Sequence, residues 1–88
     1  MALSDNIRTA IKSDRAIIGY RETMKFLKSG GEMEGVIISN NAPENMSKDV
    51  LANAKAANVK LESFDGTSKD LGTACGKPFP VSVMIIKG

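Results

Sequence analysis

Apolar residues recur along this chain with two different spacings, which divide its 88 residues into alternating helices and strands. Spacings of three and four residues predict helices, and short runs of β-branched residues predict strands. The apolar face of a first helix is formed by Leu3, Ile7, Ala10 and Ile11. Ser4 or Asp5 is suited to cap the start of this helix. Residues 15–18 follow as an apolar run of strand length.

A second helix is predicted after Gly19, and Gly30 with Gly31 provides the glycine that commonly ends a helix. Its apolar face is formed by Tyr20, Thr23, Met24 and Leu27. Residues 32–34 are expected to form a loop. Residues 35–39 form the clearest buried strand, and the Asn-Asn-Ala-Pro sequence at 40–43 predicts a turn directly after it.

The second half of the chain predicts a third helix over residues 44–58 and a strand over residues 59–64. The inner face of this helix is expected to comprise Met46, Val50, Ala54 and Ala57. Thr67 and Asp70 resemble a capping box that opens a fourth helix over residues 68–74. After a loop, a last strand is expected over residues 81–86, with Val81, Val83 and Ile85 on one face.

The regular alternation of helices and strands with short connections predicts the fold class. Such an order is typical of an α/β protein in which helices cover both faces of a sheet, a three-layer α/β/α sandwich. A chain of 88 residues has room for one hydrophobic core, so residues 1–88 are expected to form a single domain. We see no internal repeat and no linker.

Composition limits the chemistry that this domain can perform. The chain has no histidine and one cysteine, which argues against metal centres, intrachain disulfides and the common nucleophile pairs. No cofactor is expected, and the spacing of Glu62, Asp65 and Asp70 matches no metal-binding loop. No apolar run is long enough to span a membrane and no signal peptide is visible, so a reducing cytoplasm is the expected location. The net charge of +2 is only weak evidence for a nucleic-acid partner.

The first candidate site is the strand-to-helix junction at residues 19–28. Gly19 permits close approach of a ligand, and the free amides at a helix start favour anions. Arg21, Lys25 and Lys28 are spaced to form a basic stripe that suits phosphates. The alternative is a solvated helix face with a Glu22–Lys25 ion pair.

Two further candidate sites lie in connections between the predicted elements. Asn40 and Asn41 come directly after a buried strand, where ligands of α/β proteins commonly bind, although a side chain that caps the next helix explains them equally well. In the sequence LGTACGKPFPV at residues 71–81, Phe79 lies between two prolines. A rigid exposed Phe79 could stack on an unpaired base, and the alternative is a phenylalanine buried in the core.

Three separated segments, GYRETMKFLKSG, VIISNNAP and FDGTSKDLGTACGKPFPVSV, together resemble one known family. They are similar in order and spacing to the archaeal and eukaryotic large-subunit ribosomal protein L-thirty-e family. This family belongs to the kink-turn RNA-binding superfamily that includes protein L-seven-Ae. The resemblance covers about residues 3–86, and it departs at VLANAKAAN, where family members usually carry a tyrosine-rich segment. It implies a mixed four-stranded sheet and a non-enzymatic ribosomal protein.

The resemblance also implies how the chain contacts a kink-turn, in which a sharp bend splays a nucleotide outward. Glu22 would accept a hydrogen bond from a guanine amino group, while Arg21 and Lys25 would meet phosphates or base edges. The splayed nucleotide would lie against Thr73, Ala74 and Cys75. The full set of expected RNA contacts is Gly19, Arg21, Glu22, Lys25, Lys28, Asn40, Asn41, Gly72, Thr73, Ala74, Cys75, Gly76, Lys77 and Phe79.

The expected partners are ribosomal RNA and neighbouring ribosomal proteins in the cytoplasmic ribosome, with a monomer when free and no membrane partner. A kink-turn protein of another ribonucleoprotein, active in RNA modification or processing, is the first alternative. The second alternative is a small nucleotide-binding α/β enzyme. The missing histidine and the absence of a GxxxxGK[ST] phosphate loop argue against the enzyme.

Overall fold

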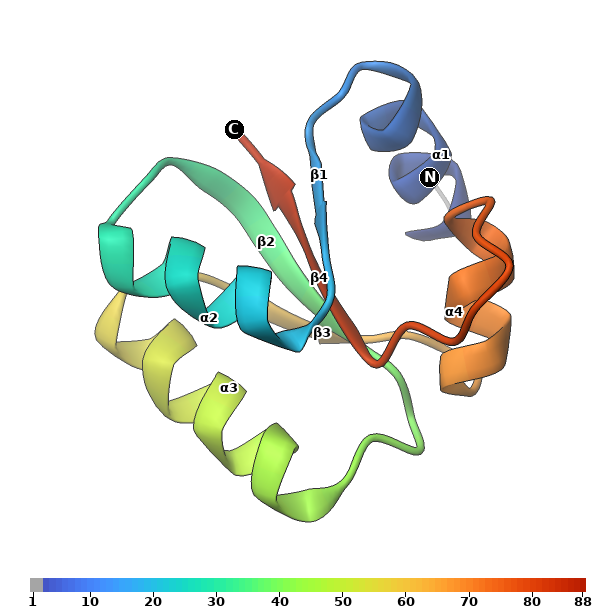
Figure 1. The fold of residues 1–88 in the computed structure, drawn as a ribbon. Helices are drawn as coiled ribbons and strands as arrows, with labels where there is room; N and C mark the ends of the chain where they lie inside the picture. The colour runs from blue at the N-terminus through green and yellow to red at the C-terminus, as the bar shows by residue number, and fades with distance from the viewer. Residues whose placement is uncertain (1–2) are drawn as a thin grey trace.

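A computed structural model describes residues 3–88, with side chains from residue 5 onward. Helices and strands alternate along the whole described chain, as predicted (Figure 1). They are α1 (Leu3–Lys12), β1 (Ala16–Ile18), α2 (Tyr20–Ser29), β2 (Met33–Ile38), α3 (Glu44–Ala56), β3 (Leu61–Ser63), α4 (Ser68–Ala74) and β4 (Val83–Lys87).

The four strands form one mixed sheet in the order β1-β4-β2-β3. The last strand in the chain, β4, lies inside the sheet and pairs antiparallel with both β1 and β2, while β2 and β3 are parallel. This confirms the mixed four-stranded sheet that the family resemblance implied. The first strand, β1, is an edge strand, so its end and the start of α2 lie at the border of the sheet.

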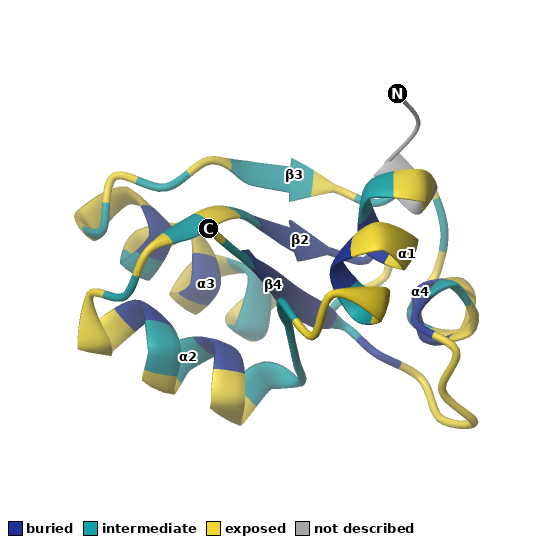
Figure 2. Cartoon of the chain, turned by 90° about the horizontal axis from the view of Figure 1, so that it is seen from above, coloured by how far each residue is buried: buried dark blue, intermediate teal, exposed yellow. Residues whose placement is uncertain are grey.

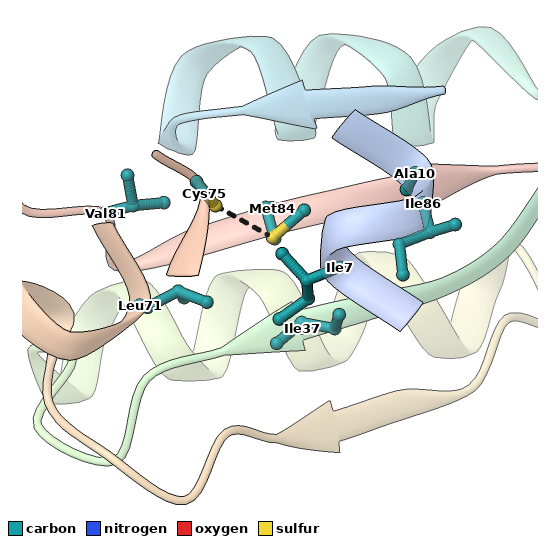
Figure 3. Packing of buried hydrophobic residues seen from close by; sticks show 8 residues of the cluster. All are labelled: Ile7, Ala10, Ile37, Leu71, Cys75, Val81, Met84 and Ile86. Carbon is teal, nitrogen blue, oxygen red and sulfur yellow. Dashed lines mark hydrogen bonds between the residues drawn. The ribbon is translucent and has the colours of Figure 1, made fainter. Parts of the chain in front are cut away.

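Helices cover both faces of the sheet, which confirms the three-layer sandwich. Figures 1 and 2 show α2 and α3 on one face and α1 and α4 on the other. Alternate residues of β4 point into the two layers: Met84 and Ile86 pack with α1 and α4, while Val83 and Ile85 pack with α2 and α3 (Figure 3 shows the first layer). This alternation is the two-residue period of a strand that is buried on both faces.

Local sequence signals fix several element boundaries. Gly19 and Gly30 flank α2 with φ angles of 103° and 76°, a region that glycine adopts without steric cost. Asn58, with a φ angle of 58°, follows the end of α3. Thr67 and Asp70 form the predicted capping box, in which each side chain bonds the backbone amide of the other.

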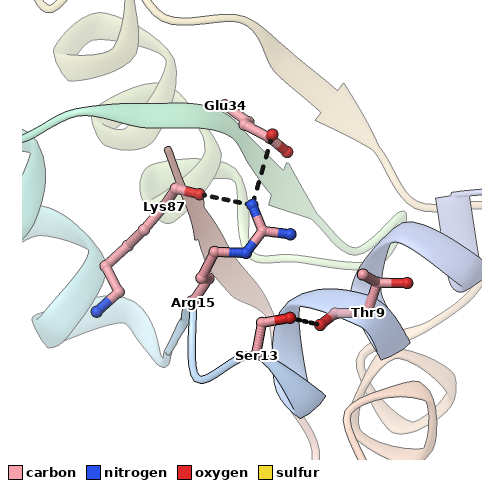
Figure 4. A network of polar contacts seen from close by, with 5 residues as sticks. All are labelled: Thr9, Ser13, Arg15, Glu34 and Lys87. Carbon is pink, nitrogen blue, oxygen red and sulfur yellow. Dashed lines mark hydrogen bonds and ion pairs between the residues drawn. The ribbon is translucent and has the colours of Figure 1, made fainter.

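The predicted loop at residues 32–34 is wrong, because β2 begins at Met33. The register shifts between Met33 and Gly35 against β4, so Glu34 is an inserted residue of the kind that makes a β-bulge. Arg15 lies just before β1, and its guanidinium contacts both the Glu34 carboxylate and the Lys87 carbonyl oxygen at 3.5 Å (Figure 4). The alternation of apolar and polar residues is interrupted at a bulge, so the sequence pattern did not predict the start of β2.

The other corrections concern element ends. Val81 precedes β4 and packs with Leu71 on the α1–α4 side, so it does not share a face with Val83 and Ile85. The third helix and third strand are shorter than expected, and β1 omits Arg15. Since α1 begins at Leu3, both Ser4 and Asp5 lie within its first turn and not at the position before the helix. The predicted inward side chain of Leu3 lies outside the described residues.

Candidate nucleic-acid interface

The junction between β1 and α2 is held by glycine backbone geometry. The Gly19 amide donates to the Val83 carbonyl oxygen at 3.1 Å, and its own carbonyl oxygen accepts from the Thr23 amide at 3.0 Å. Gly19 has no side chain to cap α2, so the first amides of the helix remain available to an acceptor from outside. The junction therefore has the free amides and the positive end of the helix dipole that favour anions.

A cavity of about 440 Å³ lies beside this junction and is called the Gly19 cavity here. It brings together the end of β1, the start of α2, the start of α3 and the loop that follows α4. Its lining includes Ile18, Gly19, Tyr20, Met46, Lys77 and Phe79. Two of the three segments singled out in the sequence, around Gly19 and around Phe79, thus meet at one concave surface.

Phe79 is exposed over 51% of its surface, so the alternative of a phenylalanine buried in the core is wrong. The loop that carries it is fastened to α4 at both ends. The Lys77 amide donates to the Gly72 carbonyl oxygen and the Val81 amide donates to the Ser68 carbonyl oxygen, both at 2.9 Å. A large apolar side chain on a loop that is already ordered is a platform on which a base can stack.

Gly72 is buried, and its role is to let this loop approach α4. A β-carbon at this position would overlap the Phe79 carbonyl oxygen. Gly72 therefore positions the loop, and burial excludes it as a direct contact.

The prediction that the Cys75 side chain lines the pocket for the splayed nucleotide also needs a correction. Its side chain is 2% exposed, and its Sγ donates to the Met84 Sδ at 3.5 Å inside the α1–α4 layer (Figure 3). Burial raises the pKa of the Cys75 thiol, and the nearby Lys77 charge offsets part of that rise. The cysteine side chain is part of the core and cannot line a nucleotide pocket. Ala74 is half-buried against the same layer, whereas Thr73, Gly76 and Lys77 are exposed.

A second concave surface, the α2 groove, runs between β1 and α2 and has a volume of about 510 Å³. Glu22 and Lys25 line it together with Phe26 and the three residues of β1. Both charged side chains are exposed, and no ion pair joins them within the described part of the chain, contrary to the alternative of a Glu22–Lys25 pair. Ala16 and Ile18 line both the groove and the Gly19 cavity, so the two hollows adjoin along β1.

The basic stripe on α2 is only partly brought to this surface. Arg21 is exposed in the first turn. Lys28 lies near the opposite end of α2, roughly 12 Å along the helix axis from Tyr20. It lines a separate hollow with Gly30 and Asn53. The structure therefore does not bring Lys28 together with the other expected contacts.

Asn41 connects two segments that are distant in sequence. Its Oδ1 accepts from the Ser68 amide at 2.8 Å and from the Ser39 hydroxyl at 3.2 Å. The side chain thus caps α4, not the next helix, α3, that sequence reasoning considered. Its amide nitrogen is left to face solvent, since Asn41 is exposed. The neighbouring Asn40 is exposed too, and its backbone amide donates to the Gly66 carbonyl oxygen at 2.9 Å.

Sequence reasoning missed the contribution of Tyr20 and Met46 to the Gly19 cavity. Both were assigned to the apolar faces of helices, and both lie in part there. The Tyr20 hydroxyl donates to Asp49 Oδ2 at 3.0 Å, and this hydrogen bond raises the pKa of Tyr20. Since the cavity exists only where α2 and α3 start side by side, no local signal marks these two residues.

Other site chemistries have no support in the described residues. No group of three or more cysteine, aspartate or glutamate side chains there could hold a metal ion. Within residues 3–88, none of the helices has the length and apolar character needed to cross a membrane.

Comparison with known proteins shows the family to which this chain belongs. Residues 1–88 match the Ribosomal protein L7Ae/L30e/S12e/Gadd45 family. The chain belongs to this family. The resemblance noted in the sequence is thereby confirmed, and a family named for ribosomal proteins supports the prediction of a non-enzymatic protein.

Relatives of this family member include the large ribosomal subunit protein eL30 of several archaea. The protein of Methanocaldococcus jannaschii is 37% identical over 86 residues, which cover 98% of this chain and 77% of the relative. That of Archaeoglobus fulgidus is 39% identical over 80 residues, which cover 91% of this chain and 87% of the relative. The family member is thus homologous to eL30 over nearly its full length.

Solved structures of the same fold include a Giardia lamblia 15.5kD RNA binding protein. It superposes with a TM-score of 0.81 at 24% identity and covers 98% of this chain and 71% of its own. A Bacillus halodurans protein of unknown function superposes with a TM-score of 0.83 at 22% identity, covering 93% and 80%. At these identities the likeness supports the fold, and the fold is as predicted.

Proposed function

We propose that this protein is a constituent of the large ribosomal subunit that binds a kink-turn in ribosomal RNA. The observation that carries the proposal is that the α2 groove and the Gly19 cavity adjoin along β1, in a chain homologous to eL30 over nearly its full length. Ribosomal RNA and neighbouring ribosomal proteins would be its partners, and the cytoplasmic ribosome its location.

The surface has the features that a bent RNA requires. The free amides at the start of α2 and the Lys25 ammonium can meet phosphates, which fixes the position of the RNA without reading its sequence. The Glu22 carboxylate can accept from a base amino group. The Gly19 cavity has a volume of about 440 Å³, and Phe79 offers a splayed nucleotide an apolar contact there.

The chain's modest net charge of +2 supports recognition by shape more than by bulk electrostatics. A straight A-form duplex hides its base edges in a deep, narrow groove, so a protein of this kind needs unpaired nucleotides to gain specificity. The proposal therefore predicts that affinity depends on the kink.

Binding can be measured with a kink-turn RNA and with a straight duplex of equal length at physiological salt. Preference for the kink-turn supports the proposal, and equal affinity contradicts it. Co-purification then separates the alternatives. Large-subunit ribosomal RNA is expected, whereas a small guide RNA would indicate a protein of another ribonucleoprotein, and the absence of RNA would favour a small enzyme.

A further inference from the structure

The sheet has two open edges, β1 on one side and β3 on the other (Figure 1). In an antiparallel pair, the residues of one strand alternate between facing the partner strand and facing away from it with their backbone groups. The Lys87 amide donates to the Arg15 carbonyl oxygen at 2.7 Å, and the Gly19 amide donates to the Val83 carbonyl oxygen at 3.1 Å. By this alternation, Ile17 faces β4 as well, and its two neighbours in β1 face away.

Those two neighbours, Ala16 and Ile18, present their backbone amides and carbonyl oxygens at the open edge. The two donors and two acceptors lie symmetrically about Ile17. A second β1 that runs in the opposite direction would satisfy all of them, with Ala16 of each copy opposite Ile18 of the other. This arrangement has a two-fold axis at Ile17, and two-fold symmetry is the commonest symmetry of protein dimers.

The two edges of the sheet differ in their protection against such pairing. Beside β3, the Lys60 ammonium forms an ion pair with the Glu62 carboxylate at 2.9 Å. Charged side chains on an edge strand oppose its pairing with another strand. The Ala-Ile-Ile sequence of β1 carries no charge, and all three residues are only half-buried although helices cover both faces of the sheet. The edge suited to pairing is therefore that of β1.

The side chains in the α2 groove beside this edge favour a second copy as the occupant. Phe26 supplies an apolar wall, while Glu22 and Lys25 supply one negative and one positive charge. Both charged side chains are exposed, and neither forms an ion pair within residues 5–88. A two-fold contact brings the same patch of two copies together, so a patch with one acid and one base is complementary to itself.

We propose that the free protein forms a weak two-fold dimer through the β1 edge, in which the β1 strands of two copies pair antiparallel and join the two sheets. This replaces the expectation of a monomer for the free protein. The dimer itself does not depend on RNA. Its consequence rests on the proposed function: because Glu22 and Lys25 line both the dimer contact and the proposed RNA surface, a second copy and a kink-turn would compete for the same groove.

Sedimentation equilibrium of the full chain without RNA measures this self-association. We expect a dissociation constant of about 0.1 mM, because a contact built on a strand of three residues is smaller than the interface of a stable dimer. The average mass should rise from near the 9.4 kDa of one chain at about 10 µM protein towards twice that mass at about 1 mM. A mass that stays at 9.4 kDa over this range would refute the dimer.

Two proline variants identify the edge that pairs. Ala16→Pro removes an outward amide from β1 and keeps the bonds of this strand to β4, so it should abolish dimerisation. Ser63→Pro is the matched control. The Phe64 amide donates to the Ile38 carbonyl oxygen, which places the neighbouring Ser63 amide on the outer edge of β3. The control should dimerise normally, and loss of the dimer in Ser63→Pro alone would move the contact to β3 and overturn the proposal.

Charge reversal tests the contact without changing the backbone. Glu22→Lys alone, or Lys25→Glu alone, removes the complementarity between the two copies and should weaken self-association by at least about 5-fold. The double variant, which carries both changes, restores the complementarity and should dimerise within about 2-fold of the wild type. Single variants that dimerise like the wild type, or a double variant no better than the singles, would exclude the α2 groove from the contact and refute the proposal.

Kink-turn RNA tests the competition. Added in equimolar amount at about 1 mM protein, it should dissociate the dimer into complexes of one chain with one RNA, because a ligand that binds only the monomer shifts the equilibrium towards it. Complexes that retain the dimer would refute the shared groove. Equal binding of kinked and straight RNA would contradict the proposed function and leave the dimer standing, because self-association is measured without RNA.

Discussion

The Asn41 side-chain oxygen accepts a hydrogen bond from the Ser68 amide at 2.8 Å, across 27 positions of sequence. This bond ties the loop after β2 to the start of α4, and thereby to the helix that supports the Phe79 loop. The oxygen and the nitrogen of the Asn41 side-chain amide therefore have different roles. The oxygen stabilises the fold, and the nitrogen is the group that we propose to donate to RNA.

These two tasks can be separated by substitution. Asn41→Ala should destabilise the protein by about 1 kcal/mol, the usual effect of losing a helix-capping oxygen. Asn41→Asp keeps the oxygen at the start of α4 and should preserve stability, yet it should weaken kink-turn binding by at least about 1 kcal/mol, because it removes a donor and adds negative charge. Urea unfolding and RNA titration measure the two effects. Unchanged RNA affinity in Asn41→Asp would limit Asn41 to its structural role.

Glu22 and Lys25 should respond differently to truncation. Lys25→Ala should weaken binding to all RNAs and lower the salt slope by roughly one phosphate contact. Glu22→Ala removes a negative charge from the surface that we propose to meet RNA, so simple electrostatics predicts tighter binding. If Glu22 reads a guanine amino group, its loss should instead cost about 1–3 kcal/mol for kinked RNA alone. Titration at several salt concentrations decides between the two, and tighter kink-turn binding by Glu22→Ala would refute the guanine contact.

Phe79→Ala should leave the protein folded, because half of the side chain already faces solvent. Its affinity for kink-turn RNA should fall by about 1–3 kcal/mol, the usual effect of losing one base–aromatic contact. Circular dichroism checks the fold and titration checks the affinity. Phe64→Ala, a change in a half-buried residue of the α1–α4 layer, is the matched control and should lower stability instead. Full RNA affinity in Phe79→Ala would mean that no base packs there.

Gly72→Ala should destabilise the protein, because Gly72, unlike the exposed Phe79, is buried. The added methyl group would overlap the Phe79 carbonyl oxygen, which is backbone and cannot rotate away. Overpacking of this kind typically costs about 1–3 kcal/mol. Displacing the loop should also reduce RNA affinity. Thermal unfolding and RNA binding should therefore both change, whereas normal behaviour in both would show that the loop can shift freely.

The Cys75 thiol should resist alkylation in the folded protein. Burial raises its pKa, so at any given pH less of the reactive thiolate is present than in the unfolded chain. The same shift means that unfolding releases a proton above the ordinary pKa of 9.0, so this group's contribution to stability should fall as pH rises past that value. Iodoacetamide labelling with and without denaturant checks the first point. Rapid labelling under native conditions would show that the Cys75 layer opens.

Sequence patterns predicted the helices of this protein better than its strands. The apolar faces around Ile7, Leu27 and Val50 follow the helical period, and the Thr67–Asp70 capping box marks the start of α4 from four neighbouring residues. The start of β2 was missed because the inserted Glu34 breaks the two-residue alternation. Val81 was placed on the wrong face because it precedes the strand, where that alternation has no meaning.

The sequence predicted the position of a candidate interface residue only where the neighbouring residues in the chain determine that position. Gly19 and Phe79 were identified because glycine at a strand–helix junction and phenylalanine between two prolines are local signals. Burial of Cys75 and the close approach at Gly72 depend on how the loop folds back on α4. The same is true of Tyr20 and Met46, whose contributions depend on which elements the sheet topology brings together.

The position of β4 has a consequence for folding of the protein. As the last element along the chain, β4 supplies the pairing partner of both β1 and β2, and its residues fill both hydrophobic layers. Until it is made, β1 has no neighbour in the sheet and only the β2–β3 pair can form. Pairing between segments so distant in sequence is intrinsically slow. The core therefore closes only when β4 pairs with β1 and β2, and the surface beside Gly19, whose amide donates to the Val83 carbonyl oxygen, is complete only after that pairing.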